Sequence, residues 1–180
     1  TQVGSSAASD VYKRQVTRPA DQADGLIDAL SQAGFAVTSF PMLETYHAPN
    51  DETREQLNQF CDQPAIELPL LAVFISSNAV RYADQSLSAL KLSWPAGVHC
   101  VPIGTATMTA IAERDWPLFH CAEESTAPNY PSSSEALLAQ SWAEDVANRE
   151  IVIFRGKGGR ETLAQTLRQR GAKVSYIETY

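Results

Sequence analysis

Short runs that are rich in apolar residues alternate with longer segments in which apolar residues recur at helical spacing. The runs have the length of β-strands: Leu70 to Ile75, Val98 to Ile103, Pro117 to Cys121, Ile151 to Phe154 and Val174 to Tyr180. A strand that is apolar on both faces must be covered on both, so this order predicts a parallel sheet with helices on each side. Right-handed crossovers then give a doubly wound α/β domain.

The segments between the runs carry the helix signals. Apolar residues at helical spacing are Val80, Ala83, Leu87 and Leu90, then Ala106, Ala110 and Ile111, then Leu138, Trp142 and Val146, and last Leu163 and Leu167. Ser132 and Glu135 match a capping box at the start of the third of these helices. Gly171 ends the last helix before the final strand. The alternation of strands and helices is typical of a flavodoxin-like domain. The order of the strands in the sheet is not encoded in it.

The N-terminal part of the chain has a different pattern. Residues 1–15 are small and polar, then charged, and lack the apolar run of a buried strand, so we expect a foreign or disordered segment. Pro19 then opens a helix that Gly34 ends, and a strand from Phe35 to Phe40 follows. After a connection, Asn50 or Asp51 caps another helix. The helix and strand after Val16 cannot form a core alone, which predicts an incomplete second α/β domain.

Composition excludes several classes of partner. The formal net charge of −7 argues against nucleic acid or an anionic membrane, since both require a basic face. No apolar run approaches the roughly 20 residues that span a bilayer, and the N-terminus lacks a secretory signal. Cys61, Cys100 and Cys121 have no metal-type spacing, and we expect reduced thiols in a cytoplasmic, monomeric protein that binds no metal.

Three turns that lead from a strand into a helix are candidate binding sites. They are Ser76-Ser77-Asn78, Gly104-Thr105-Ala106-Thr107 and Arg155-Gly156-Lys157-Gly158-Gly159-Arg160. Such turns lie at the carboxyl edge of a parallel sheet, where free amides and helix dipoles attract anions. Alternatively, the serines cap a helix, and the glycines form a tight turn with solvated cations. The third turn lacks the spacing of dinucleotide and phosphate loops, so a nucleotide-dependent transferase has little support.

Five stretches in order resemble uroporphyrinogen-III synthases and together span Val16 to Tyr180. They are VTRPADQADGLIDALSQAGF, VFISSNAV, PIGTATMTAI, SSSEALL and IVIFRGKGGRETLAQTLRQRGAKVSYIETY. The resemblance implies two α/β domains that are joined by a two-stranded ladder and enclose the active site. Residues 16–44 would be the opening piece of a discontinuous first domain and residues 45–175 the second domain. Residues 176–180 would begin the linker that returns to the first domain, whose remainder is absent here.

The same resemblance implies the chemistry. Family members are lyases that close hydroxymethylbilane to uroporphyrinogen III with inversion of the last pyrrole and loss of water, without a cofactor. Tyr180 falls at the tyrosine expected to help the hydroxyl leave, and Arg18 would face the same cleft. With the turns above, the expected substrate-binding residues are Arg18, Ser76, Ser77, Thr105, Thr107, Arg155, Gly156, Lys157 and Gly158.

Other interpretations of the same residues are open. Tyr180 could be an aromatic residue of the interdomain ladder, and Arg18 a surface arginine. For the whole chain, the alternative is a non-catalytic doubly wound module that binds an anionic small molecule. That module would bind its ligand without turnover, whereas the synthase would release isomer III.

Overall fold

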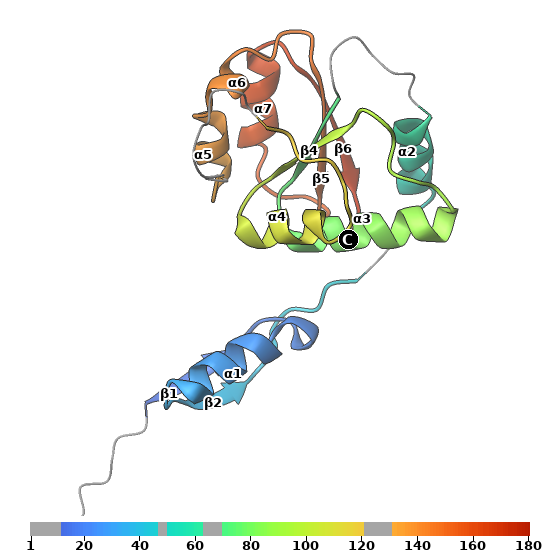
Figure 1. The fold of residues 1–180 in the computed structure, drawn as a ribbon. Coiled ribbons are helices and arrows are strands. Elements are labelled where there is room, and N and C mark those ends of the chain that lie inside the picture. Colours follow the sequence, from blue (N-terminus) through green and yellow to red (C-terminus); the bar gives the residue numbers. More distant parts are fainter. Residues whose placement is uncertain (1–11, 47–49, 63–69, 121–130) are drawn as a thin grey trace, which may run out of the picture. The chain divides into compact units, whose positions relative to one another are not determined.

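The computed structural model describes residues 12–46, 50–62, 70–120 and 131–180. Contacts divide the chain into two compact units, Thr1–Tyr46 and His47–Tyr180, which are described separately (Figure 1). The elements of the first unit are β1 (Lys13–Val16), a 3-10 helix (Ala20–Gln22), α1 (Asp24–Gln32) and β2 (Ala36–Ser39).

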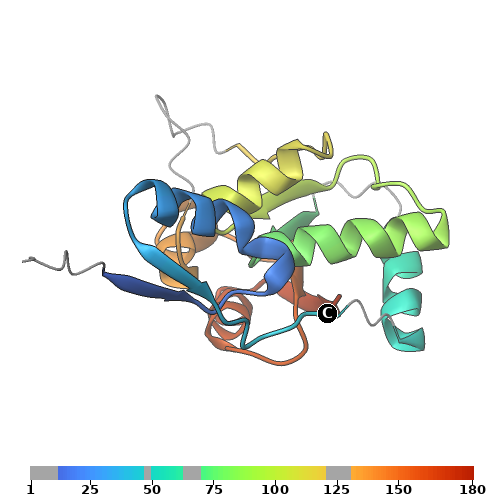
Figure 2. The same cartoon turned by 90° about the horizontal axis from the view of Figure 1, so that it is seen from below.

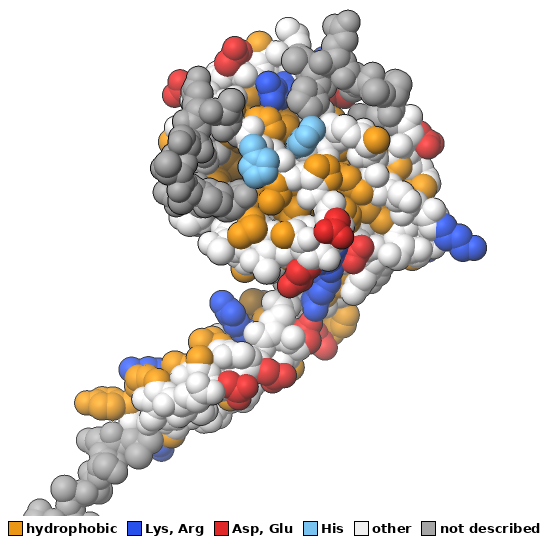
Figure 3. Space-filling model, viewed as in Figure 1, with side chains coloured by type: hydrophobic (Ala, Val, Ile, Leu, Met, Phe, Trp, Pro, Cys, Tyr) orange, Lys and Arg blue, Asp and Glu red, His pale blue; other side chains and the backbone are white. Residues whose placement is uncertain are grey.

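The first unit contains two paired strands with one α-helix between them in sequence. β1 runs parallel to β2, with Lys13 opposite Ala36 and Val16 opposite Ser39. Residues 13–15, which the sequence placed in a foreign or disordered segment, thus form part of a strand, while the foreign origin of residues 1–15 stays a prediction. These residues carry no apolar signal because their side chains are exposed, and the strand is held by backbone hydrogen bonds to β2. Orange hydrophobic side chains of this unit lie at the surface among charged ones in Figure 3.

The second unit is built around a parallel sheet. Its elements are α2 (Asp51–Cys61), β3 (Leu71–Phe74), α3 (Ser77–Leu90), β4 (His99–Pro102), α4 (Thr105–Ala112), α5 (Ser134–Leu138), α6 (Ser141–Glu144), β5 (Glu150–Arg155), α7 (Thr162–Gln169) and β6 (Lys173–Glu178). The strand order is β4-β3-β5-β6, and every pair is parallel. This order is that of the first strands of a flavodoxin-like sheet, so the predicted fold class is confirmed.

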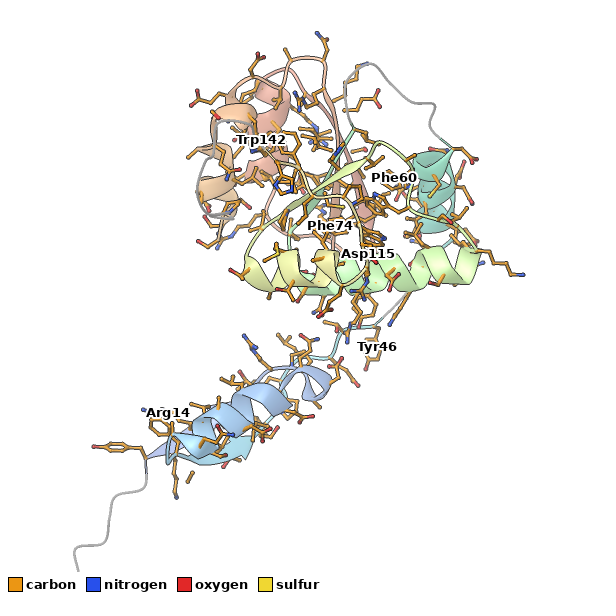
Figure 4. The ribbon with its side chains drawn as sticks, viewed as in Figure 1. Arg14, Tyr46, Phe60, Phe74, Asp115 and Trp142 are labelled. Atoms are coloured by element: carbon orange, nitrogen blue, oxygen red, sulfur yellow. The ribbon has the colours of Figure 1, made fainter. Side chains whose placement is uncertain are left out.

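The sheet buries both of its faces. Ala72 and Phe74 of β3 contact the cluster formed with α2, α3 and α4, whereas Leu71 and Val73 contact the cluster formed with α5, α6 and α7. Figure 2 shows α3 and α4 on one side of the strands. In Figure 4, Phe60 extends from α2 toward the sheet, where its ring centroid lies 5.3 Å from that of Phe154. The alternation of faces explains why these strands are continuously apolar in sequence.

Several element boundaries differ from those predicted. In place of a strand from Pro117 to Cys121, Leu118 forms an isolated parallel bridge with Cys100, while Cys121 lies outside the described residues. The single helix expected over Leu138 to Val146 is two short helices, because Gln140 has an extended backbone. The cap of α5 is Ser133 rather than Ser132, since the Ser133 side chain accepts the Ala136 N–H at 3.1 Å.

Candidate functional site

Two of the predicted turns lie side by side at the carboxyl edge of the sheet. β3 is followed in sequence by β4, which lies on one side of it, while β5 lies on its other side. The chain thus reverses its direction of winding between β3 and β5, and the turns after these strands flank that point. Open α/β sheets bind their ligands in the crevice at such a switch point.

Ser76 opens the helix that follows β3. Its Oγ accepts a hydrogen bond from the Ala79 N–H at 3.1 Å and so caps α3, as the capping alternative predicted. The same Oγ lies 3.0 Å from the hydroxyl of Tyr180. Ser76 and Ser77 are both half-buried. Capping and a second polar contact therefore coexist on one serine.

Tyr180 lies two residues beyond the end of β6 and not within the strand. Its backbone carbonyl accepts a hydrogen bond from the Lys157 N–H at 2.8 Å. Its ring stacks on that of Tyr82 from α3, with centroids 5.4 Å apart. Its hydroxyl meets Ser76. The structure therefore brings together Ser76, Gly156, Lys157 and Tyr180, which the sequence placed in three separate segments.

Arg155 is the last residue of β5 rather than part of the open turn, which corrects its predicted position. Only 8% of the residue is exposed. Its guanidinium pairs with Glu161 at 2.7 Å and with Glu178 at 3.2 Å, and it lies 3.7 Å from the centre of the Tyr176 ring. Two carboxylates of the same chain therefore offset its charge, and a direct role in substrate binding stays a prediction.

The acidic partners of Arg155 were missed in the sequence. Burial favours a lower pKa for Arg155, but the hydrogen bonds and charges of Glu161, Tyr176 and Glu178 outweigh it and raise the pKa above its usual value. Hydrogen bonds from Tyr176 and then from Arg155 lower the pKa of Glu161. The spacing of Tyr176 and Glu178 places these two side chains on one face of a strand, but it does not indicate that Arg155 lies opposite them.

Glu178 also ties the glycine turn to β6. Its Oε1 accepts a hydrogen bond from the Gly158 N–H at 3.1 Å, and its carbonyl accepts one from Thr53 Oγ1 at 3.0 Å. The turn after β5 is thereby fixed to the strand that leads to Tyr180. The Lys157 side chain is exposed, and Lys157 and Tyr180 both line a cavity of about 740 Å³ beside α2 and β6.

The remaining predicted residues lie elsewhere. Thr105 is exposed at the start of α4, whereas Thr107 is only 3% exposed, so the open turn predicted there does not present Thr107 to solvent. Arg18 is exposed in the first unit, and its expected place opposite Tyr180 stays a prediction. Among the described residues, no cluster of three or more His, Cys, Asp or Glu side chains could hold a metal. No helix in the described ranges is both long and apolar enough to cross a membrane.

Known proteins of one kind are similar to this chain. The profile of the family described as "Uroporphyrinogen-III synthase HemD" matches residues 24–180. The uroporphyrinogen-III synthase of Proteus mirabilis is 32% identical over 166 residues, which cover 92% of this chain and 77% of that protein. The uroporphyrinogen-III synthase of Escherichia coli (strain K12) is 31% identical over 167 residues, which cover 92% of this chain and 63% of that protein.

Solved structures agree in fold. A mutant uroporphyrinogen III synthase from the extreme thermophile Thermus thermophilus superposes with a TM-score of 0.63 at 17% identity, over 93% of this chain and 61% of that one. The wild-type enzyme gives a TM-score of 0.57 at 17% identity, over 94% and 61% of the two chains. The present chain thus spans somewhat under two thirds of the length of these structures and of the Escherichia coli relative. Because a family profile matches most of its length, the chain belongs to the uroporphyrinogen-III synthase family.

Proposed function

We propose that the protein is a uroporphyrinogen-III synthase, a lyase that converts hydroxymethylbilane into uroporphyrinogen III with inversion of the last pyrrole and loss of water. The observation that carries this proposal is the contact between the Tyr180 hydroxyl and Ser76 Oγ, at 3.0 Å, beside the switch point of the sheet. A proton donor then stands where an open α/β sheet binds its ligand.

The substrate is a flexible chain of pyrroles with many carboxylates. The amino end of α3 at Ser76 and Ser77 offers free amides, and the turn after β5 adds the exposed amine of Lys157. Such groups bind carboxylates whatever the net charge of the protein. Binding the substrate in one folded conformation lowers the entropic cost of bringing its two end rings together. It also disfavours simple head-to-tail closure to isomer I.

Tyr180 is the proposed acid. Ser76 Oγ accepts the Ala79 N–H, so its own O–H is free to donate to the Tyr180 oxygen, which leaves the phenolic proton for the substrate. Transfer of that proton to the departing hydroxyl breaks the C–O bond and releases water and an azafulvene. The far ring attacks the azafulvene at its substituted carbon, and the spiro intermediate fragments and recloses inverted. The proton lost in the final closure restores the phenol.

This chemistry needs proton transfer and positioning, so we propose that no cofactor takes part. We also infer a cytoplasmic monomer whose partner is a small molecule rather than nucleic acid. The net charge of −7 supports this choice, as does the membership in a family of biosynthetic enzymes with bacterial relatives.

The test is the isomer formed by the full-length protein. It is supplied with freshly made hydroxymethylbilane, and the products are oxidised and separated by chromatography. We expect isomer III, and we expect Tyr180→Phe to slow its formation by about 10²-fold or more, the usual worth of general acid catalysis. Isomer I alone, at the rate without protein, would refute the proposed function. Binding of the substrate without turnover would instead favour the non-catalytic module.

A further inference from the structure

The Tyr180 side chain has to cross the end of a neighbouring strand. Tyr180 follows β6, whereas Ser76, which its hydroxyl meets, follows β3, and β5 lies between these two strands. Adjacent strands are about 4.8 Å apart, so β3 and β6 are separated by roughly 10 Å. The phenol ring therefore lies over the first residue after β5, which is Gly156.

Gly156 gives the ring the space to do so. A Cβ atom placed on Gly156 would lie 2.8 Å from Cε2 and 3.0 Å from Cζ of Tyr180. Carbon atoms in favourable contact are about 3.5 to 4.0 Å apart, so any side chain at this position would displace the ring. Gly158 and Gly159 have φ of 76° and 116°, whereas Gly156 does not adopt the left-handed conformation. The lack of a side chain at Gly156 therefore allows the close approach of the Tyr180 ring and is not required by the backbone conformation.

Contacts with residues of more than one element fix the position of the Tyr180 ring. Its centroid lies 5.4 Å from that of Tyr82 in a stacked arrangement, and the Tyr180 carbonyl is held by the Lys157 N–H. The hydroxyl contacts Ser76 at the far end of the ring. Because the backbone of Tyr180 is fixed beside Gly156, a group added at Gly156 would shift the ring and move the hydroxyl away from Ser76.

We propose that Gly156 is a positioning residue. Because it has no side chain, it fixes the position of the Tyr180 hydroxyl relative to the leaving group. This role rests on the proposed function of Tyr180 as the acid. It goes beyond a backbone contact with the substrate, because it acts through the tyrosine and predicts an effect on turnover rather than on binding.

The first test is Gly156→Ala in the full-length protein. We expect the kcat for isomer III to fall about 10²-fold with KM nearly unchanged, since displacement of a reacting group by about 1 Å has effects of this size. Gly25→Ala is the matched control, because a Cβ on Gly25 meets nothing within 4 Å, and it should retain the wild-type rate. A wild-type kcat for Gly156→Ala would overturn the proposal, as would a loss confined to KM.

The second test combines the change with Tyr180→Phe. Once the hydroxyl is gone there is nothing left to misplace, so Gly156→Ala should cost no further activity in that background. A further loss equal to that seen beside Tyr180 would overturn the positioning role. If Tyr180→Phe alone kept the wild-type rate, the proposed acid would fail instead, and the two failures are thereby distinguished.

The third test needs no activity. Gly156→Ala should lower the thermal unfolding midpoint of the wild-type protein but not that of a Tyr180→Ala variant, in which the methyl group enters vacated space. If Gly156→Ala alone does not fold, the double variant Gly156→Ala with Tyr180→Ala should fold. An equal cost in both backgrounds, or a double variant that also fails to fold where Tyr180→Ala folds, would show that the ring is not what the added group meets.

Discussion

The two units of the chain differ in how much of their apolar surface they bury. In the second unit the sheet is covered on both faces, and β3 and β5 are wholly buried from Leu71 to Phe74 and from Ile151 to Arg155. Of the described residues of the first unit, Val16 and Ala23 alone are buried. Phe40, Met42, Leu43 and Tyr46 are each more than half exposed.

This difference in burial indicates that the rigid part of the candidate site lies in the second unit. A helix with a pair of strands is too small to bury an apolar face, and its exposed apolar side chains form a surface suited to covering by other residues. The switch point, in contrast, is framed by strands with a packed core on each side. Ser76, Gly156 and Tyr180 are therefore held by the second unit itself.

The largest expected contrast concerns one phenylalanine from each unit. Phe154 is fully buried and stacks on Phe74 with centroids 4.6 Å apart, so Phe154→Ala should lower the free energy of unfolding by about 3 to 5 kcal/mol. Phe40 is 57% exposed, and Phe40→Ala should change the free energy of unfolding of the second unit by less than about 0.5 kcal/mol. Tryptophan fluorescence in denaturant measures this, because Trp94, Trp116 and Trp142 all belong to the second unit. Equal losses for the two variants would mean that the units share a core.

A smaller contrast is expected between two arginines. Arg155→Met leaves Glu161 and Glu178 without their cation, and because both carboxylates are partly exposed we expect a loss of only about 1 to 2 kcal/mol. Arg14 of β1 is exposed, so Arg14→Met should leave the tryptophan-reported transition unchanged. If Arg155→Met did not change the free energy of unfolding, the ion pairs of Arg155 with Glu161 and Glu178 would not stabilise the turn after β5.

The smallest expected effect is a dependence on pH. The pKa of Glu161 is lowered by the hydrogen bond from Tyr176 and by Arg155, so its contribution to stability is present above the ordinary value of 4.5 and is lost as the pH falls through the lowered value. Glu161→Gln should therefore flatten the fall in stability of the second unit below about pH 4.5. The comparison is Asp28→Asn on α1, which belongs to the first unit and should leave the stability curve of the second unit as it is. A slope that Glu161→Gln does not change would contradict the lowered pKa.

Prediction from the sequence succeeded best where burial is two-sided. Leu70 to Ile75 and Ile151 to Phe154 are continuous apolar runs because both faces of β3 and β5 are covered, and each run contains or overlaps its strand. β1 was missed because its pairing with β2 depends on backbone groups that every sequence has. The division between α5 and α6 was missed because both short helices turn their apolar residues toward the sheet, which preserves the helical spacing of Leu138 and Trp142.

The site was only partly predictable for a related reason. The turns could be found because they follow apolar runs, and the resemblance supplied a role for Tyr180. The pairing of Arg155 with Glu178 depends on the register of β5 and β6, in which these two residues are direct partners. Register between distant strands is set by packing, and no local pattern in the sequence encodes it. The same is true of the approach of Tyr180 to Gly156.

Amide hydrogen exchange of the full-length protein, with and without uroporphyrinogen III, tests most directly whether the carboxyl edge of the second unit binds the tetrapyrrole. We predict slower exchange at Ser77 and at Gly156–Gly158 when the ligand is present, with no change at Gly97 and Gly171, which precede β4 and β6 at the opposite edge. Slower exchange at Gly97 and Gly171 but not at Ser77 and Gly156–Gly158 would contradict binding at the carboxyl edge.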